Sequence, residues 1–236
     1  HPCPCCTMNV ARLVASIGGY VFGLAQDEIA VHMYGGAEAV LPVAGGTARV
    51  TETSAYPWDG AIRVTVDAEG TAPFTLSLRI PAWCEGATAR VNGVDVPVTT
   101  SRGYLRLTRA WGKGDVVELT LPMLPERVWA HPEVKADVGR VAIRRGPMVY
   151  CLEGQDQAAA LHRLRLPRDA DLSAAFRDSL LGGIVVVQAT GHAVAEPSSD
   201  LYRTAPPAEA ASPLLAVPYY IWCNRGQNPM QVWIRE

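Results

Sequence analysis

The sequence has no surplus of positive charge. Its 236 residues include 21 Lys and Arg against 23 Asp and Glu, which gives a formal net charge of −2. Nucleic acids and anionic membranes attract proteins through clustered positive charge, and this composition offers none. No apolar run approaches the roughly 20 residues that cross a bilayer, the longest candidate being residues 183–189. The sequence therefore predicts a soluble protein with neither nucleic-acid nor membrane partners.

Cysteines are too few for a disulfide scaffold, and they are unevenly placed. The chain has six cysteines, and three of them, Cys3, Cys5 and Cys6, crowd into its opening segment. Such crowding suits metal or redox chemistry better than structural disulfides. It favours a reducing compartment, so we expect a cytoplasmic location.

The N-terminus lacks an initiator methionine, a positively charged leader and an apolar signal segment. It opens directly on the cysteine-rich stretch that begins with His1. We therefore expect the sequence to begin inside a longer protein.

What the chain does contain is apolar residues in two successive patterns. With 49% hydrophobic and 19% charged residues, it can build one large core or two medium ones. After Asn9, a good N-cap, the residues Val10, Leu13, Val14 and Ile17 fall at helical spacing. The pattern predicts a single amphipathic helix over 9–20 with no helix beside it.

Short alternating or β-branched runs follow the helix. Asn92-Gly93 lies between two of them and accepts the positive φ of a hairpin turn. The expected strands of the first half are 29–34, 48–53, 62–66, 74–80, 89–91, 94–98, 104–108 and 116–121. Strands this short and this evenly punctuated are typical of an antiparallel sandwich.

A second β unit is expected after the proline-bounded segment 122–132. Its expected strands are 138–144, 148–152, 183–190, 218–222 and 230–234, and residues 196–213 are expected to form a surface loop. The predicted fold is thus mostly β, with two successive antiparallel β-sandwich domains preceded by one helix. The domains are placed at 1–23, 24–125 and 126–236.

Several motifs resemble one enzyme family, and they occur in that family's order. Residues 3–20, with a Cys-x-Cys-Cys-x-x-Asn-x-x-Arg element, are similar to the family's last barrel helix. Residues 56–60 (Tyr-Pro-Trp-Asp-Gly), 79–84, 145–150 and 218–226 resemble its β domains. Each motif is weak alone, but together they cover nearly the whole chain. The chain resembles the C-terminal part of glycoside hydrolase family 127, the β-L-arabinofuranosidase family.

The resemblance implies part of a helical barrel, a catalytic site and a substrate. Residues 1–23 would be the end of a catalytic (α/α)6 barrel. Cys5 would be the nucleophile of a retaining mechanism, and Cys5 and Cys6 would bind Zn²⁺. The chemistry is coherent because a thiol with a pKa near 8.5 is mostly protonated at neutral pH, and zinc holds it as the thiolate. The substrate would be an arabinofuranoside, and the β domains could mediate a homodimer.

Much of such a site is absent from the sequence. Zinc takes four ligands, and Cys5 with Cys6 supplies two, or three if Cys3 joins. The family's glutamate acid/base and remaining ligands belong to the upstream barrel, so we expect this chain alone to be inactive and to bind zinc weakly or not at all. Alternatively, these cysteines are only reactive thiols at a frayed end.

A second function class is a stand-alone carbohydrate-binding or assembly module. The helix over 9–20 argues against it, because a stand-alone module would not need a single barrel helix that carries a cysteine pair. Tyr56, Trp58 and Trp83 could stack on sugars, but aromatic residues in β domains more often pack in cores. Glu153 and Asp156 form a carboxylate pair, but spacing alone does not place them in one cleft, and catalytic use is not expected.

Overall fold

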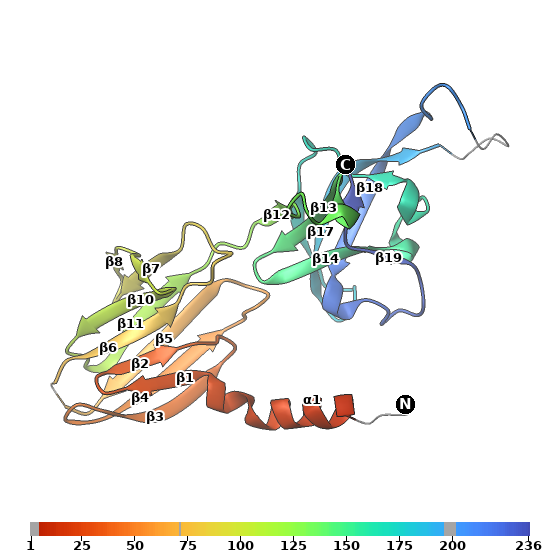
Figure 1. Ribbon diagram of the computed structural model, residues 1–236. Helices are drawn as coiled ribbons and strands as arrows, with labels where there is room; N and C mark the ends of the chain where they lie inside the picture. The colour runs from red at the N-terminus through yellow and green to blue at the C-terminus, as the bar shows by residue number, and fades with distance from the viewer. Residues whose placement is uncertain (1–4, 71, 196–201) are drawn as a thin grey trace. The chain divides into compact units, whose positions relative to one another are not determined.

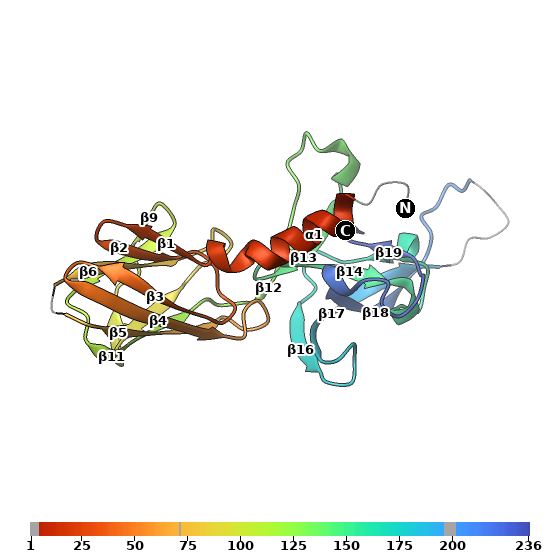
Figure 2. The same cartoon turned by 90° about the horizontal axis from the view of Figure 1, so that it is seen from below.

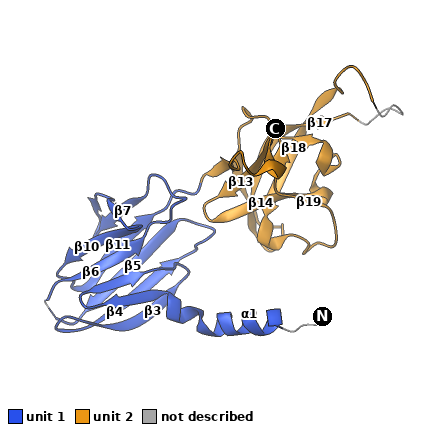
Figure 3. Ribbon diagram, viewed as in Figure 1, with its two compact units in different colours: residues 1–123 blue, residues 124–236 orange. Residues whose placement is uncertain are grey.

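The computed structural model describes residues 5–70, 72–195 and 202–236. The chain divides into two compact units, residues 1–123 and 124–236 (Figure 3). No helix among the described residues is long and apolar enough to cross a membrane. Cys3 lies outside the described residues.

Unit 1 opens with α1, Cys5–Ser16, which continues as the 3-10 helix η1, Ile17–Tyr20 (Figure 1). The expected N-cap at Asn9 was wrong, since this residue lies inside the helix. The sequence between Cys5 and Asn9 contains no glycine or proline, so the helical turn extends back towards the N-terminus. None of the residues of α1 is buried.

The rest of unit 1 is a sandwich of two sheets, which Figure 2 shows as two layers. In one sheet the strand order is β1-β2-β6-β10-β9, and in the other it is β3-β4-β5-β11-β7-β8. The pairing is antiparallel except between β2 and β6. The strands are β1 Phe22–Ala25, β2 Glu28–Val31, β3 Ala37–Val43, β4 Gly46–Ser54, β5 Ala61–Ala68, β6 Phe74–Arg79, β7 Thr88–Val91, β8 Val94–Val96, β9 Thr100–Ser101, β10 Tyr104–Arg109 and β11 Lys113–Thr120.

Alternation along the strands builds the core between these sheets. In β5, Ile62, Val64 and Val66 are buried while the residues between them face outwards, as the period of two in a strand requires. They meet Leu76 and Leu78 of the opposite sheet in one apolar cluster.

Unit 2 is built from a sheet that closes on itself. Its strand order is β12-β13-β20-β15-β17-β18-β14-β19, β16 pairs with β17, and an extra β13–β14 pairing joins distant members of that path. The strands are β12 Pro125–Val128, β13 Arg140–Arg145, β14 Met148–Glu153, β15 Leu164–Arg165, β16 Ser173–Arg177, β17 Ile184–Val194, β18 Glu209–Pro218, β19 Met230–Gln231 and β20 Ile234–Arg235, with 3-10 helices η2 Lys135–Asp137, η3 Gly154–Asp156, η4 Leu161–Arg163 and η5 Tyr219–Ile221.

Each face of this sheet packs against its own apolar cluster. Tyr150 and Leu152 of β14 point into the larger cluster, whereas Cys151 between them joins a smaller cluster with Val217 and Ile221. Ile221 belongs to η5, so this 3-10 helix is anchored on the second face.

The mostly β, antiparallel class expected from the sequence is confirmed, but several local expectations need correction. Residues 209–213, expected within the surface loop 196–213, belong to β18. Residues 218–222 were expected as a strand, but Tyr219–Ile221 forms η5. The second β unit was expected to begin after the segment 122–132, but this segment already contains β12, which pairs with β13. The layers of unit 2 belong to one continuous sheet rather than to two separate ones, because β14 pairs both with β13 and with β18.

Candidate functional site

Cys5 and Cys6 lie in the first turn of α1, and both are exposed. Their Sγ atoms are 3.9 Å apart. The first turn carries no acidic side chain. The local structure therefore presents two neighbouring, exposed sulfur atoms on one turn of a helix.

The distance between the sulfur atoms can be compared with zinc geometry. Two thiolates bound at about 2.3 Å to one tetrahedral zinc ion stand roughly 3.8 Å apart. The separation of 3.9 Å between the two Sγ atoms therefore fits two ligands of one ion. Within residues 5–70, 72–195 and 202–236, no three His, Cys, Asp or Glu side chains gather in a group that could hold a metal.

The remainder of α1 and the first residue of η1 present apolar side chains outwards. Val10, Leu13, Val14 and Ile17 are between 42% and 67% exposed, and they follow the spacing of one helix face. An amphipathic helix normally buries its apolar stripe against a neighbouring element. The exposed stripe of α1 is therefore the surface expected of a helix that packs against a further element.

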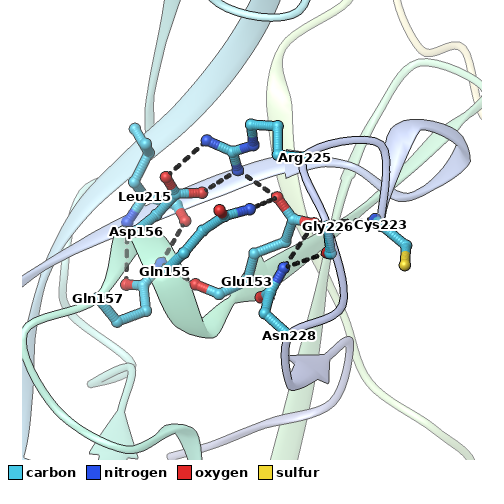
Figure 4. Close-up of polar contacts among 9 residues, drawn as sticks. All are labelled: Glu153, Gln155, Asp156, Gln157, Leu215, Cys223, Arg225, Gly226 and Asn228. Atoms are coloured by element: carbon cyan, nitrogen blue, oxygen red, sulfur yellow. Dashed lines mark hydrogen bonds and ion pairs between the residues drawn. The ribbon is translucent and has the colours of Figure 1, made fainter.

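A group of ionisable side chains lies in unit 2, largely shielded from solvent (Figure 4). Glu153, at the end of β14, is completely buried. Arg225 forms ion pairs with both Glu153 and Asp156. Its Nη1 donates to Asp156 Oδ1 at 2.9 Å. The backbone N–H of Cys223 donates to Glu153 Oε1 at 3.0 Å, and Gln155 Nε2 donates to Glu153 Oε2 at 3.1 Å. We call Glu153, Asp156 and Arg225 the carboxylate–arginine cluster.

The electrostatics of this cluster are those of a satisfied ion-pair network. Burial by itself would raise the pKa of Glu153, but hydrogen bonds from Arg225, the Cys223 N–H and Gln155 outweigh burial and lower it. Hydrogen bonds to Asp156 and Glu153 raise the pKa of Arg225. Burial, with the nearby Glu153 and Asp156 carboxylates, raises the pKa of the Cys151 thiol to about 12.

This arrangement serves structure rather than acid–base chemistry. A general acid needs a pKa near the working pH and access to a substrate, whereas Glu153 is buried and has a lowered pKa. Sequence spacing alone could not place Glu153 and Asp156 together, but the structure does. Arg225 forms an ion pair with each of them. Arg225 lies 72 residues from Glu153 in the sequence, so no local signal marked it as their partner.

The aromatic residues that could have stacked on sugars take part in packing. Tyr56 and Trp83 are partly buried against the core of unit 1, and the rings of Tyr56 and Tyr34 meet edge to face at 5.8 Å between centroids. Trp58 is 47% exposed. The packing interpretation is confirmed for Tyr56 and Trp83.

Comparison with protein families gives two adjoining matches. Residues 28–123 match the β-L-arabinofuranosidase GH127 middle domain, and residues 125–235 match the glycoside hydrolase family 127 C-terminal domain. The chain belongs to glycoside hydrolase family 127. The two matches follow the two compact units of the structure, 1–123 and 124–236.

Similarity to known relatives extends over nearly the whole chain. The chain is 34% identical over 245 residues to a non-reducing end β-L-arabinofuranosidase of Bifidobacterium longum subsp. longum, and this match covers 99% of the chain and 37% of the relative. A crystal structure of a GH127 β-L-arabinofuranosidase from Geobacillus stearothermophilus T6 is 44% identical with a TM-score of 0.95, covering 99% of this chain and 38% of that one.

A solved GH127 β-arabinofuranosidase is 33% identical with a TM-score of 0.89, and it is covered over 39% of its length by the whole of this chain. The chain therefore spans less than two-fifths of the length of each of these relatives.

Proposed function

We propose that this chain forms the C-terminal part of a retaining β-L-arabinofuranosidase whose nucleophile is Cys5. The observation that carries the proposal is the pair of exposed thiols in the first turn of α1, with sulfur atoms 3.9 Å apart. It occurs in a family 127 chain whose relatives are named β-L-arabinofuranosidases.

In this proposal the Cys5 thiolate attacks the anomeric carbon of the arabinofuranoside. The carbon–sulfur bond forms as the bond to the leaving oxygen breaks, and a general acid gives that oxygen a proton. Water then attacks the same carbon, the carbon–sulfur bond breaks, and the same group, now a base, accepts the proton of the water. Two inversions retain the configuration of the released arabinose and restore Cys5.

Zinc would be held by Cys5 and Cys6, whose separation suits two ligands of one tetrahedral ion. A bound zinc ion supplies positive charge that keeps the thiol of Cys5 ionised at neutral pH. The remaining ligands would come from outside the described residues, because the described residues place no third candidate ligand beside the pair. We propose the same origin for the general acid.

The exposed stripe of α1 supports the same proposal. Its apolar side chains would face neighbouring helices of a catalytic barrel, and the two β units would brace that barrel or form the contacts of a homodimer. We propose that the chain acts within a longer protein, since its relatives are more than twice its length.

The test is hydrolysis of a chromogenic β-L-arabinofuranoside, with and without added zinc. The 236-residue chain should show no turnover. The longer protein should be active, and Cys5→Ser should remove its activity. Losing the proton donor alone costs roughly a hundred- to ten-thousand-fold in rate. Turnover by the 236-residue chain that disappears on Cys5→Ser would contradict the proposal, because a complete site would then lie within these residues.

A further inference from the structure

Two stacked aromatic side chains lie exposed on unit 2 where β18 ends. The ring centroids of Tyr219 and Trp222 are 6.4 Å apart, with 22° between the ring planes. Tyr219 is 46% exposed and Trp222 is 38% exposed. Single exposed aromatic side chains are common at protein surfaces, but contiguous apolar patches mark interaction sites more often than scattered residues do. The stacked pair is therefore a candidate recognition surface.

The backbone holds this pair in place from both sides. Ile221, between the two rings in sequence, is buried in the smaller apolar cluster of unit 2. The N–H of Trp222 donates to the carbonyl of Tyr219 at 3.1 Å. The next residue, Cys223, donates its N–H to the buried carboxylate of Glu153. The carboxylate–arginine cluster thus fixes the segment that carries the rings, which lowers the conformational entropy lost when a ligand binds.

Tyr219 also lines a cavity of about 620 Å³, together with Asp137, Arg140 and Gln231. Arg140 Nη1 and Gln231 Nε2 donate to the carbonyl of Trp233, at 3.3 and 2.7 Å. The Asp137 side chain is half-buried and makes no hydrogen bond or ion pair with any residue that the structure describes. The cavity therefore combines an aromatic ring with an open carboxylate acceptor.

We propose that Tyr219, Trp222 and Asp137 form a subsite for a neutral sugar ring of the glycan. An aromatic face packs against the apolar C–H groups of a sugar, while its hydroxyls donate to a carboxylate. Among the residues that line the cavity, the carboxylate of Asp137 and the guanidinium of Arg140 carry opposite charges, and this balance favours a neutral ligand over a charged one. A covering protein surface would bury this carboxylate and would have to supply it with a partner. The sugar class rests on the proposed function.

The test is binding of L-arabinose and of a short arabino-oligosaccharide to the 236-residue chain, followed by calorimetry and by ligand-observed NMR. Trp222→Ala and Tyr219→Ala should each weaken binding by roughly three- to tenfold, the range for a lost aromatic contact. Asp137→Asn, which keeps the shape of the side chain, should also weaken it. Tyr219→Phe keeps the ring and should retain most of the affinity.

Phe176→Ala is the matched control, because Phe176 is another aromatic residue of unit 2 and is 65% exposed. It should leave binding unchanged, and circular dichroism should show each variant folded. Absence of binding by the wild-type chain, or equal binding by folded Trp222→Ala, Asp137→Asn and wild type, would overturn the subsite. Self-association that Trp222→Ala abolishes, without sugar binding, would also overturn it in favour of a protein contact.

The same titration separates this inference from the role of Cys5. Cys5→Ser should keep the sugar affinity of the chain, whereas it should remove hydrolysis in the longer protein. Loss of hydrolysis on Cys5→Ser without any sugar binding in unit 2 would overturn the subsite alone. Sugar binding that depends on Trp222, in a longer protein that stays active after Cys5→Ser, would overturn the proposed nucleophile alone.

Discussion

The cysteine pair of α1 and the carboxylate–arginine cluster of unit 2 differ in how far the described residues complete them. Cys5 and Cys6 are exposed on a helix that buries none of its residues. Glu153 is completely buried, and Arg225, Gln155 and the backbone hold its oxygen atoms. Removing one member of a buried, paired set of ionisable groups destabilises a fold, whereas we propose that the exposed cysteines belong to a site that other residues complete.

The largest expected effect comes from breaking the buried cluster. Arg225→Ala leaves the carboxylate of Glu153 buried without its cation, and removing one partner of a buried ion pair costs about 3–5 kcal/mol. We expect a loss of this size in the free energy of unfolding of unit 2, measured by chemical denaturation.

The matched control is Arg63→Ala, which breaks the pair of Arg63 with Glu118. Both side chains there are about half exposed, so the expected cost is below about 1 kcal/mol. Equal losses for Arg63→Ala and Arg225→Ala would show that the buried cluster does not stabilise unit 2.

A pair of leucine substitutions sharpens the comparison between the helix and the sandwich. Leu76 is fully buried in the core of unit 1, whereas Leu13 on α1 is 55% exposed. Leu76→Ala should cost about 2–5 kcal/mol, and Leu13→Ala should change the free energy of unfolding by less than about 0.5 kcal/mol.

Hydrogen exchange gives an independent reading of the same difference. The amides of 10–17 should exchange faster than those of β5 and β6 in a monomeric chain. Equal protection in the two regions, or a cost of several kcal/mol for Leu13→Ala, would mean that α1 is packed in this chain.

Thiol alkylation compares the exposed and the buried cysteines. Cys5 and Cys6 are exposed, whereas Cys151 is 1% exposed and its pKa is raised by burial to about 12. Iodoacetamide attacks thiolates, so peptide mass spectrometry should find Cys5 and Cys6 modified and Cys151 unmodified up to about pH 10. In denaturant all three should react, and fast reaction of Cys151 in the folded chain would contradict its burial.

The raised pKa of Cys151 has a smaller consequence for stability. Above about pH 8.5 the unfolded chain releases this proton, while the folded chain keeps it. The unfolded state then binds fewer protons, so the free energy of unfolding should fall as pH rises from about 8.5 towards about 12. Cys151→Ala should flatten this fall relative to Cys223→Ala, and equal slopes would argue against it.

Strands could be predicted from the sequence where apolar and polar residues alternate regularly. The prediction failed where the local sequence fits more than one structure. β5 alternates buried and exposed residues, and its expected range lies inside the observed one. β3 was missed because its run Ala37–Val43 is rich in alanine and contains Pro42, which fits an edge strand but weakens the signal. Residues 219–221 were expected in a strand because aromatic residues favour sheets, but they form η5.

The two side-chain groups were unequally predictable for a similar reason. Cys5 and Cys6 are adjacent in sequence, so a local motif was enough to single them out. Glu153 meets Arg225 because β14 pairs with both β18 and β19, the strands that precede and follow Arg225 in the sequence. Such a contact depends on long-range topology, which composition and periodicity do not contain.

The most direct test of the proposed nucleophile is to trap the covalent sugar. The longer protein would be acid-quenched during turnover of a β-L-arabinofuranoside with a very good leaving group, so that the first step outruns the second. Peptide mass mapping should then find one arabinosyl group on the peptide that contains Cys5, and none in the Cys5→Ser variant. An arabinosyl group on a carboxylate, or on Cys6 with Cys5 unmodified, would contradict the account.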